Sequence, residues 1–489
     1  MAEIVLLHPR IGDMDELRSS PALPLSLLHA ASLTSKEFEV ALVDMRIEPD
    51  WRRRLKEVIG SDTLFVGVTA FTGPMILWNL EMIDEVRKLT DAPVVWGGVH
   101  ATVEPDTTLA DPHCDVIVMG EGEETLLELA RALKNHGPLE RVSGIAFKRG
   151  GELVKMPQRE LLDLDTLPEI PYQLVDVSKY MPLYRGRKSL YFQSSRGCPH
   201  ACRYCYNPRF NRCRWRAQSA ERTIERFRYL VGKFGAEDVY LVDDNIFIDV
   251  ERDRKIIEGI RELGVTWQIQ GVDVIALKSV EDKFIETLKA SGLLRLTIGV
   301  ESGSPRIRKL MGKAGTVEDI KEAYERMARH DIAVFASFMG GLPTETREDI
   351  KMTVDLILEL LSIHPQAYNS PIYVYTPYPG TRMFDMAREM GFQPPASLKE
   401  WGEVGSWDVW NWKDGSKATK KFHESLYFVS NFLDRKAHTY DAPLLVKVLS
   451  DIYRPLARWR VKNFRFEFLI EKVLADWAQS RLSRYPGGM

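Results

Sequence analysis

Short β-branched runs alternate with amphipathic helical patterns over the first 135 residues, and this alternation restricts the fold more than any other feature. Leu80, Ile83 and Val86, for example, share one helical face. Strands that alternate with helices pair in parallel and are covered on both faces. The pattern therefore predicts a doubly wound α/β domain over residues 1–138. Its expected strands are residues 4–7, 40–44, 64–69, 93–96 and 116–119.

A second run of the same pattern begins near residue 186. Between the two runs, residues 139–185 contain a short hairpin-like stretch and several prolines, which indicate a linker. Six further strand candidates predict a partial (β/α)6 barrel over residues 186–388, with its chemistry at the C-terminal ends of the strands. The candidates are residues 190–194, 239–242, 267–270, 294–300, 334–338 and 372–375. The alternation of strand and helix patterns then ends, and we expect a small, mainly helical domain over residues 389–489.

The composition excludes several classes of protein. Hydrophobic residues make up 45% and charged residues 28% of the 489 residues, as in ordinary globular proteins. A formal net charge of -3 argues against a strongly basic nucleic-acid binder. The sequence has no apolar run near the roughly 18 to 20 residues of a membrane span, and its N-terminus lacks the pattern of a secretory signal. We therefore expect a cytoplasmic protein with no nucleic-acid partner.

Three of the five cysteines crowd into one loop as CxxxCxxC, directly after an expected strand. These are Cys198, Cys202 and Cys205, and an odd number of clustered cysteines does not indicate a disulfide framework. A 4Fe-4S cluster normally takes four protein thiolates, so three would leave one iron open to a small molecule. The alternative is a zinc site completed by His200 or Cys213. We interpret Cys213 as incidental, and Cys114 as a small core residue.

This motif resembles the signature of the radical S-adenosylmethionine (SAM) superfamily, CxxxCxφC with an aromatic residue at φ, here Tyr204. The resemblance implies that the open iron binds the amine and carboxylate of SAM. It also implies that an electron cleaves the sulfonium to a 5′-deoxyadenosyl radical, and hence an external electron donor of the flavodoxin or ferredoxin type. The three cysteines would then be both the metal ligands and the catalytic centre.

Other positions match the same family in order along residues 188–385. By resemblance, Asp243, Asp244 and Asn245 contact the methionyl amino group, and Glu301 contacts the ribose or the methionyl group. Gly340 and Gly341 correspond to the stretch whose backbone lies against adenine. Taken singly, each of these could be a helix cap or a turn.

Glycines follow two strands of the first domain, at Gly97-Gly98 and at Gly120-Glu121-Gly122. Such glycines let the backbone approach a ligand closely. They do not form a dinucleotide fingerprint, because the third glycine of GxGxxG is replaced by Thr125. Together with the second domain they resemble the cobalamin-binding branch of the radical SAM superfamily, which implies a Rossmann-like cobalamin-binding domain.

The lower face of cobalt would then meet the loop that starts at Thr69, which offers no strong ligand. The DxHxxG pattern of histidine-ligating cobalamin domains is also missing around His8, so we expect no histidine on cobalt. The alternative is a degenerate domain that keeps the shape without cobalamin.

The C-terminal region contains two patterns that the resemblance does not cover. Its aromatic residues could form the floor of a substrate pocket or simply pack the helical domain onto the barrel. These residues are Trp401, Trp407, Trp410, Trp412 and Phe422. Residues 454–481 interleave aromatic and basic side chains, as in a helix lying on an anionic membrane surface or a docking helix with snorkelling charges.

The function implied by the resemblance is that of a cobalamin-dependent radical SAM methyltransferase acting on an unactivated carbon. One SAM would methylate cobalamin, and a second would provide the radical that activates the substrate. Two alternatives remain open: a relative with both cofactors that closes a ring or oxidises without methyl transfer, and a non-catalytic sensor. The substrate itself, whether a small molecule, a lipid or a peptide, is not specified by the sequence.

Overall fold

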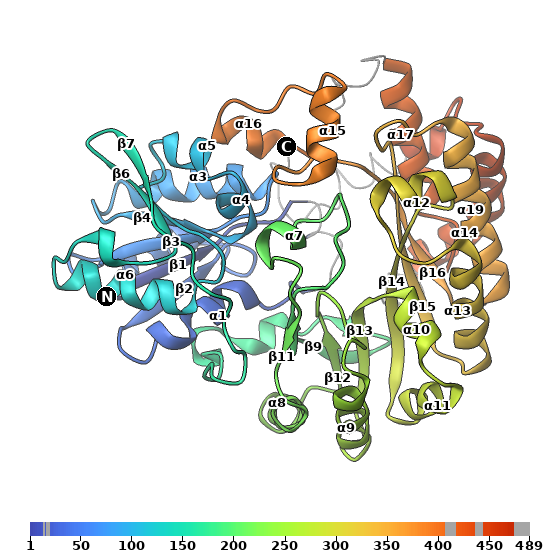
Figure 1. The fold of residues 1–489 in the computed structure, drawn as a ribbon, viewed down its shortest axis with the longest axis horizontal. Helices are drawn as coiled ribbons and strands as arrows, with labels where there is room; N and C mark the ends of the chain where they lie inside the picture. Colours follow the sequence, from blue (N-terminus) through green and yellow to red (C-terminus); the bar gives the residue numbers. More distant parts are fainter. Residues whose placement is uncertain (13–14, 16–19, 406–416, 436–443, 474–489) are drawn as a thin grey trace.

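The computed structural model describes residues 1–12, 15, 20–405, 417–435 and 444–473. It contains two seven-stranded sheets that stand side by side, each covered by helices (Figure 1). The strand order is β2-β1-β3-β4-β5-β6-β7 in the first sheet and β16-β15-β14-β13-β12-β9-β8 in the second. The chain completes the first sheet before it starts the second.

The first sheet has a parallel part with helices on both faces, as the sequence predicts. Its parallel strands are β1 (Ile4–His8), β2 (Val40–Asp44), β3 (Phe65–Thr69), β4 (Val94–Gly97) and β5 (Val116–Val118). The helices are α1 (Leu25–Thr34), α2 (Trp51–Val58), α3 (Met75–Val86), α4 (Gly98–Val103), α5 (Pro105–Ala110) and α6 (Glu123–Lys134).

Strand β1 shows why this domain is doubly wound. Ile4 and Leu6 belong to the core shared with α1 and α6, whereas Val5 and Leu7 belong to the core shared with α2 and α3. All four side chains are buried. Because successive side chains of a strand point to opposite faces, this uninterrupted apolar run requires helices on both sides of the sheet.

The hairpin that the sequence placed in a linker belongs to the first sheet. Its strands are β6 (Ile145–Arg149) and β7 (Glu152–Lys155), and β6 pairs antiparallel with β5. Ile145 and Phe147 are buried in the domain core. Farther along, the Tyr180 hydroxyl donates to Asp44 Oδ2 at 2.9 Å. The segment after β5 is therefore packed onto the first domain, an attachment that local prolines and turns do not reveal.

The second sheet is an open half barrel with six parallel strands, which confirms the expected fold class. They are β9 (Arg187–Phe192), β12 (Asp238–Leu241), β13 (Thr266–Val272), β14 (Leu293–Glu301), β15 (Ala333–Gly340) and β16 (Tyr368–Val374). A short strand, β8 (Leu183–Tyr184), pairs antiparallel with β9 at one edge. The outer helices are α8 (Ala220–Phe234), α9 (Val250–Arg261), α10 (Val274–Ser279), α11 (Asp282–Ala290), α12 (Pro305–Met311), α13 (Val317–Arg329) and α14 (Arg347–Ile363).

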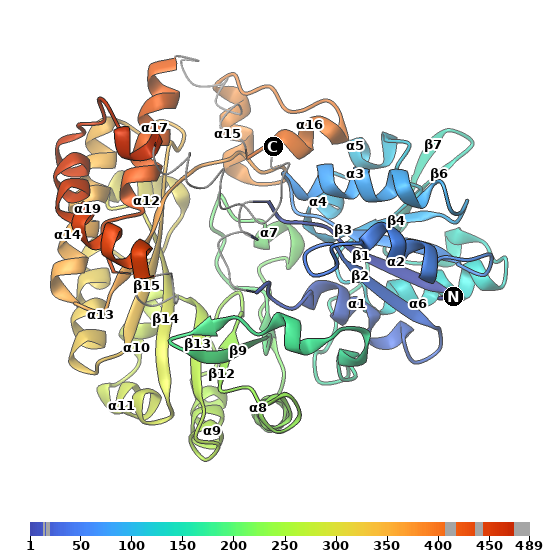
Figure 2. The ribbon, with the colours of Figure 1, turned by 180° about the vertical axis from the view of Figure 1, so that it is seen from behind.

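The helices of the C-terminal region pack on two different parts of the molecule. After α15 (Arg382–Glu389), helix α16 (Leu398–Glu403) returns to α3 of the first domain. Helix α17 (Lys417–Ser430) instead covers β16, and α19 (Leu444–Asn463) packs on α14 and α17. Figure 2 shows α14 and α19 on the side of the molecule opposite the first sheet. Within the described ranges, no helix combines the length and the apolar character that crossing a bilayer requires.

The aromatic residues expected in this region do not gather in one place. Trp401 is buried against the first domain, with its ring 5.6 Å from that of His100. Phe422 packs against Phe464 and Phe466 on the barrel side. Trp407, Trp410 and Trp412 lie outside the described residues. Trp401 therefore packs α16 onto the first domain, whereas Phe422 packs parts of the C-terminal region against each other.

Candidate functional site

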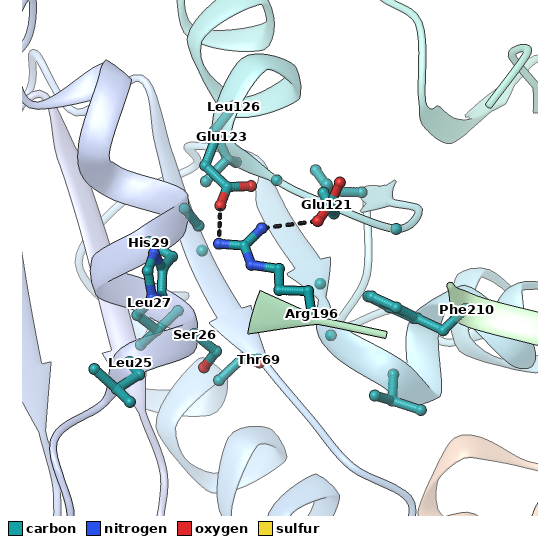
Figure 3. Close-up of a pocket in the computed structure, with 18 of the residues that line it drawn as sticks. Leu25, Ser26, Leu27, His29, Thr69, Glu121, Glu123, Leu126, Arg196 and Phe210 are labelled. Atoms are coloured by element: carbon teal, nitrogen blue, oxygen red, sulfur yellow. Dashed lines mark hydrogen bonds and ion pairs between the residues drawn. The ribbon is translucent and has the colours of Figure 1, made fainter. Parts of the chain in front are cut away.

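A cavity of about 310 Å³ lies between the two sheets (Figure 3). Asp244, which follows the end of β12 in the second sheet, lines it together with Arg196, which lies in a separate two-stranded sheet. Parallel α/β folds bind their ligands at the C-terminal ends of strands, and here two such edges face one space. From the first domain the cavity is lined by all six residues predicted to contact cobalamin, which are Thr69, Gly97, Gly98, Gly120, Glu121 and Gly122.

Two of these glycines are required for different reasons. Gly98 has φ +89°, and a Cβ there would lie 2.8 Å from both Ala70 O and Thr69 Oγ1. Gly120 has φ +79°, but a Cβ there would meet no atom within 4 Å. Gly98 therefore permits the close approach of β4 to the neighbouring loop, whereas Gly120 keeps space open at the cavity wall.

An ionic bridge joins the two domains across this cavity. Arg196 donates to Glu121 Oε1 at 2.8 Å and to Glu123 Oε1 at 2.6 Å (Figure 3). Arg216 donates to both oxygens of Glu121, at 2.9 and 3.0 Å. Glu121 was predicted to contact a cofactor, but its carboxylate is already bound to two guanidinium groups. The structure therefore gives it the role of holding the glycine loop against the barrel.

The three clustered cysteines lie in the loop between β10 (Ser195–Arg196) and α7 (Asn207–Phe210). Gly197 has φ +84°, and a Cβ there would lie 2.0 Å from Arg214 O, so this turn requires glycine. Asn207 fastens the loop because its side chain accepts from Cys198 N at 3.1 Å and donates to Cys198 O at 2.7 Å. Asn207 is not among the residues predicted from the sequence, since one asparagine after a cysteine motif has no distinctive spacing.

Two N–H groups point at the cysteine sulfurs. Asn245 Nδ2 donates to Cys198 Sγ at 3.2 Å, and Asn207 N donates to Cys205 Sγ at 3.4 Å. Burial raises the pKa of all three thiols, and it raises that of Cys205 to about 12. Such buried thiols need a positive partner to ionise, and iron in a cluster provides one.

The same loop argues against a single tetrahedral ion. Among the described residues, no group of three or more His, Cys, Asp or Glu side chains converges on a single-ion site. Zinc would require its sulfurs within about 4 Å of one another, because each Zn–S bond is about 2.3 Å long. Three sulfurs that each hold a different iron of a cubane stand farther apart, so the donor set fits the cluster better than the zinc alternative.

Asp243 and Asp244 are adjacent but have different surroundings. The Asp243 carboxylate is buried and accepts hydrogen bonds from the Ser194 backbone and from the hydroxyls of Ser194 and Ser195. Asp244 lines the cavity, where it accepts from Gly197 N at 2.7 Å and Tyr206 OH at 3.2 Å. The predicted contact to the methionyl amine therefore suits Asp244, whereas Asp243 braces the strand that leads into the cysteine loop.

Glu301 ends β14 in a strained conformation. Its φ is +68°, which is rare for a residue other than glycine. Its buried carboxylate accepts from Tyr204 OH at 3.3 Å and from Ser337 Oγ at 3.1 Å. Burial raises the pKa of Glu301, and the nearby Lys313 ammonium opposes this rise. The structure thus joins Glu301 to the aromatic residue of the cysteine motif, 97 positions away along the chain.

The loop at Gly340 and Gly341 is held by an acidic side chain. Glu345 accepts hydrogen bonds from the backbone N–H groups of Gly341 and Leu342. Gly341 has φ +77°, and a Cβ at Gly340 would lie 3.1 Å from Ile372 Cγ2. The Gly341 N–H is therefore already paired, so the predicted contact with adenine would have to use other atoms of this turn.

Several cavity residues were not identified from the sequence. His29 lines the cavity from α1, and Tyr206 and Phe210 line it from the segment after Cys205. Burial lowers the pKa of His29 well below its usual value, and the Arg196 guanidinium adds to this effect. The imidazole is therefore neutral. The sequence offers no signal for this site, because a histidine on an apolar helix is usually only a core residue.

Both domains that line the cavity match known protein families. Residues 192–357 match the Radical SAM superfamily, and residues 21–130 match the B12 binding domain. An uncharacterized methyltransferase of Pyrococcus horikoshii is 28% identical over 394 residues, which is 79% of this chain and 83% of that protein. An anaerobic magnesium-protoporphyrin IX monomethyl ester cyclase of a Synechocystis species is 28% identical over 390 residues, which is 78% of this chain and 76% of that protein.

Solved structures share the architecture. The radical SAM methyltransferase TsrM from Kitasatospora setae, with cobalamin and a [4Fe-4S] cluster bound, superposes with a TM-score of 0.65 at 20% identity. That match covers 80% of this chain and 76% of TsrM. The cobalamin-dependent radical SAM enzyme OxsB, with aqua-cobalamin and SAM bound, gives a TM-score of 0.68 at 18% identity, covering 98% of this chain and 80% of OxsB. At these identities the likeness establishes the fold.

A half barrel with a three-cysteine loop at its open end, facing a B12-binding sheet, defines a radical SAM enzyme with a cobalamin domain. The chain thus combines a Radical SAM superfamily domain with a B12 binding domain, which is the domain combination of the cobalamin-binding radical SAM family. The cofactors of that family are a 4Fe-4S cluster, SAM and cobalamin.

Proposed function

We propose that this protein is a cobalamin-dependent radical SAM methyltransferase that methylates an unactivated carbon. The observation that carries the proposal is the cavity shared by the glycine loops of the first domain and Asp244 of the second. A methyl group held on the first domain must reach a carbon that the second domain activates. One space lined by both sets of residues allows this transfer without a large domain movement.

The residues present divide the binding tasks between them. Cys198, Cys202 and Cys205 would hold three irons. Asp244 and Glu301, which both accept hydrogen bonds from the cysteine loop, would orient SAM. When bound, the cluster supplies an electron that cleaves SAM, and cobalamin supplies a metal that accepts and releases methyl groups. The chain itself contributes orientation: Arg196 and Arg216 hold the glycine loop, and Asn207 holds the cysteine loop.

A second candidate keeps both cofactors but transfers no methyl group. The Synechocystis relative is a cyclase, and it matches this chain at the same identity as the Pyrococcus methyltransferase. Ring formation or oxidation on the same scaffold is therefore the competing function. A purely sensory role is disfavoured, because Glu301 is held in a strained conformation next to the cysteine loop.

The decisive test follows the methyl group. The protein, reconstituted anaerobically with iron, sulfide and cobalamin, would be reduced and given SAM labelled with deuterium in its methyl group. We expect the label on cobalamin, with one S-adenosylhomocysteine formed for each cobalamin labelled. In a variant with all three cysteines changed to alanine, 5′-deoxyadenosine should disappear. Formation of 5′-deoxyadenosine without any labelled cobalamin would favour the cyclase-type function.

We further propose a low-potential reductant of the flavodoxin or ferredoxin type and a cytoplasmic location. Free thiols that must hold a cluster require a reducing compartment. The substrate would be a small molecule, a lipid or a peptide with an unactivated C–H bond. Mass spectrometry of an extract incubated with the reduced protein and deuterium-labelled SAM would identify the substrate by its mass increase.

A further inference from the structure

The C-terminal helix α19 presents its most apolar side to solvent. Leu444, Val448, Ile452 and Leu456 follow one another at intervals of four residues, so they form one stripe along the helix. All four are exposed, and the exposed fraction reaches 77% for Leu444 and 70% for Ile452. Leu445 and Leu449 extend the same stripe and are also exposed. We call these six side chains the α19 surface.

The opposite side of α19 accounts for its attachment to the protein. Ser450, Ala457 and Val461 lie about half a turn from the α19 surface, and all three are buried. Small side chains thus face α14 and α17, and large apolar side chains face outward. This inverts the usual arrangement for a surface helix, in which the apolar stripe packs on the core. An exposed apolar stripe of this kind marks an interaction site.

The apolar surface continues beyond the helix and includes an aromatic residue. Trp459 lies within the stripe with 54% of its side chain exposed, and Phe468 is 87% exposed. Ile470 and Val473 follow, and both are exposed. Tryptophan prefers the boundary between a bilayer and water, where one side of its ring is apolar and its N–H stays hydrated.

The net positive charge of this segment favours an anionic partner. Residues 444–473 contain seven Lys or Arg and three Asp or Glu, a net charge of +4 in a chain whose net charge is -3. Lys447, Arg458 and Lys462 flank one edge of the stripe. Among the described residues, Lys447 and Lys462 have no carboxylate partner within ion-pair distance. An apolar stripe bordered by cations complements an anionic surface that has an apolar interior.

Two other occupants fit less well. A symmetric contact with a second copy would place two surfaces of net charge +4 against each other. The last 16 residues of the chain, 474–489, contain one Asp and two Arg, so they do not provide the missing negative charge either. We therefore propose that α19 docks this enzyme on an anionic lipid bilayer, with the helix lying in the headgroup region.

Vesicle binding of the full-length protein tests this proposal without reference to catalysis. We expect the protein to float with vesicles of equal parts phosphatidylglycerol and phosphatidylcholine, and much less with phosphatidylcholine alone. Added salt should weaken the binding. Each cation near the surface contributes about fivefold, so a Lys447→Gln/Lys462→Gln variant should bind the mixed vesicles about 25-fold more weakly.

The apolar contribution is tested with a matched pair of variants. Leu445→Asp/Ile452→Asp places charge in the stripe and should reduce vesicle binding by at least about tenfold. Leu89→Asp/Leu153→Asp makes the same change at two exposed leucines of the first domain and should bind like the wild type. All four side chains are exposed, so circular dichroism should show folded protein in both cases.

Three results would overturn the proposal. One is wild-type protein that does not float with the mixed vesicles. Another is an equal loss of binding in the Leu89→Asp/Leu153→Asp control. The third is a wild-type dimer in light scattering that becomes a monomer in Leu445→Asp/Ile452→Asp without any vesicle binding, which would assign the α19 surface to a second copy.

Discussion

Arg196 donates a hydrogen bond to Glu123 across the boundary between the two domains, with Nη2 2.6 Å from Oε1. Arg196 lies two residues before the first cysteine of the cluster loop, and Glu123 is the first residue of α6. The Glu123 side chain is only 2% exposed, so the pair is shielded from water. The bridge therefore fixes the loop that would hold iron relative to the loop that would hold cobalamin.

Breaking this bridge should destabilise the protein. Arg196→Ala leaves the Glu123 carboxylate buried without its charged partner, which costs about 3–5 kcal/mol. Denaturant unfolding of the apoprotein measures this loss, and cobalamin affinity should fall with it. The control is Arg131→Ala, which breaks the exposed pair with Glu37 and should change little. Equal losses in the two variants would contradict a special role for the Arg196 bridge.

Replacing the cluster cysteines should not affect cobalamin binding. Alanine at Cys198, Cys202 or Cys205 should remove the cluster and abolish 5′-deoxyadenosine formation, because each thiolate holds one iron. Iron content and visible absorbance report the cluster, and gel filtration with cobalamin reports the first domain. Cys213→Ala should keep both, since this thiol lies outside the three-cysteine motif and donates a hydrogen bond to His200 O at 3.7 Å. Reduction-dependent 5′-deoxyadenosine from the triple alanine variant would contradict the assignment.

Gly120 should increase cobalamin affinity, because it leaves space open at the cavity wall. Asparagine tolerates positive φ, so Gly120→Asn adds a side chain at the cavity wall with little backbone strain. We expect cobalamin affinity to fall at least tenfold, or about 1.4 kcal/mol. Gly150→Asn is the matched control, because Gly150 also has positive φ and open space but lies in the β6–β7 turn. A similar loss in both variants would show that the cavity is not the binding site.

Substitution at Gly98 should lower the stability of the protein even in the absence of cobalamin. Even the Cβ of alanine would lie 2.8 Å from Ala70 O, and its φ of +89° is unfavourable for any other residue. We expect Gly98→Ala to reduce the free energy of unfolding by about 1–3 kcal/mol. Denaturant unfolding without cobalamin measures this loss, and unchanged stability would show that the loop relaxes around the new atom.

Acid should weaken the contact between α4 and α16. His100 is buried between Thr72 and Trp401, and burial lowers its pKa to about 3. Its folded pKa lies below the unfolded value of about 6.5, so its contribution is complete above pH 6.5 and is lost as pH falls toward 3. Between about pH 7 and pH 5 the loss is about 2 kcal/mol. Urea unfolding at both pH values measures it.

A His100→Gln variant should show a smaller loss over the same interval, because it removes one of the groups that titrate. His8, whose pKa burial lowers to about 4, should account for part of the dependence that remains. An unchanged pH dependence in His100→Gln would mean that the wild-type loss arises elsewhere in the protein.

Cobalamin should bind without a histidine on cobalt. The loop from Thr69 offers no strong ligand, and the His8 imidazole is buried with Nδ1 2.8 Å from Pro9 O. We also expect cobalamin to bind with its own base displaced, so the electron paramagnetic resonance spectrum of the cob(II)alamin form should lack nitrogen triplet splitting. His29 is the imidazole that does line the cavity. Triplets that vanish in His8→Ala or in His29→Ala would identify an axial ligand and refute the prediction.

The sequence by itself determined the two parallel sheets and the chemistry of the cysteine loop. Strand positions were predictable because apolar runs such as Val5 to Leu7 must be buried on both faces, which is a local property of the chain. The loop was predictable because three thiols within eight residues restrict the possible ligands wherever the loop lies.

Only the tertiary structure decided how these parts meet. Arg196 and Glu123 are 73 positions apart, and Tyr204 and Glu301 are 97 positions apart, so no local pattern records either contact. Asp243 and Asp244 are adjacent, yet only the tertiary structure shows which of them lines the cavity. Adjacent residues after a strand point in different directions, and packing decides which one meets the cavity. The outward-facing stripe of α19 likewise depends on which side of the helix packs against α14 and α17, and those contacts join residues that lie far apart along the chain.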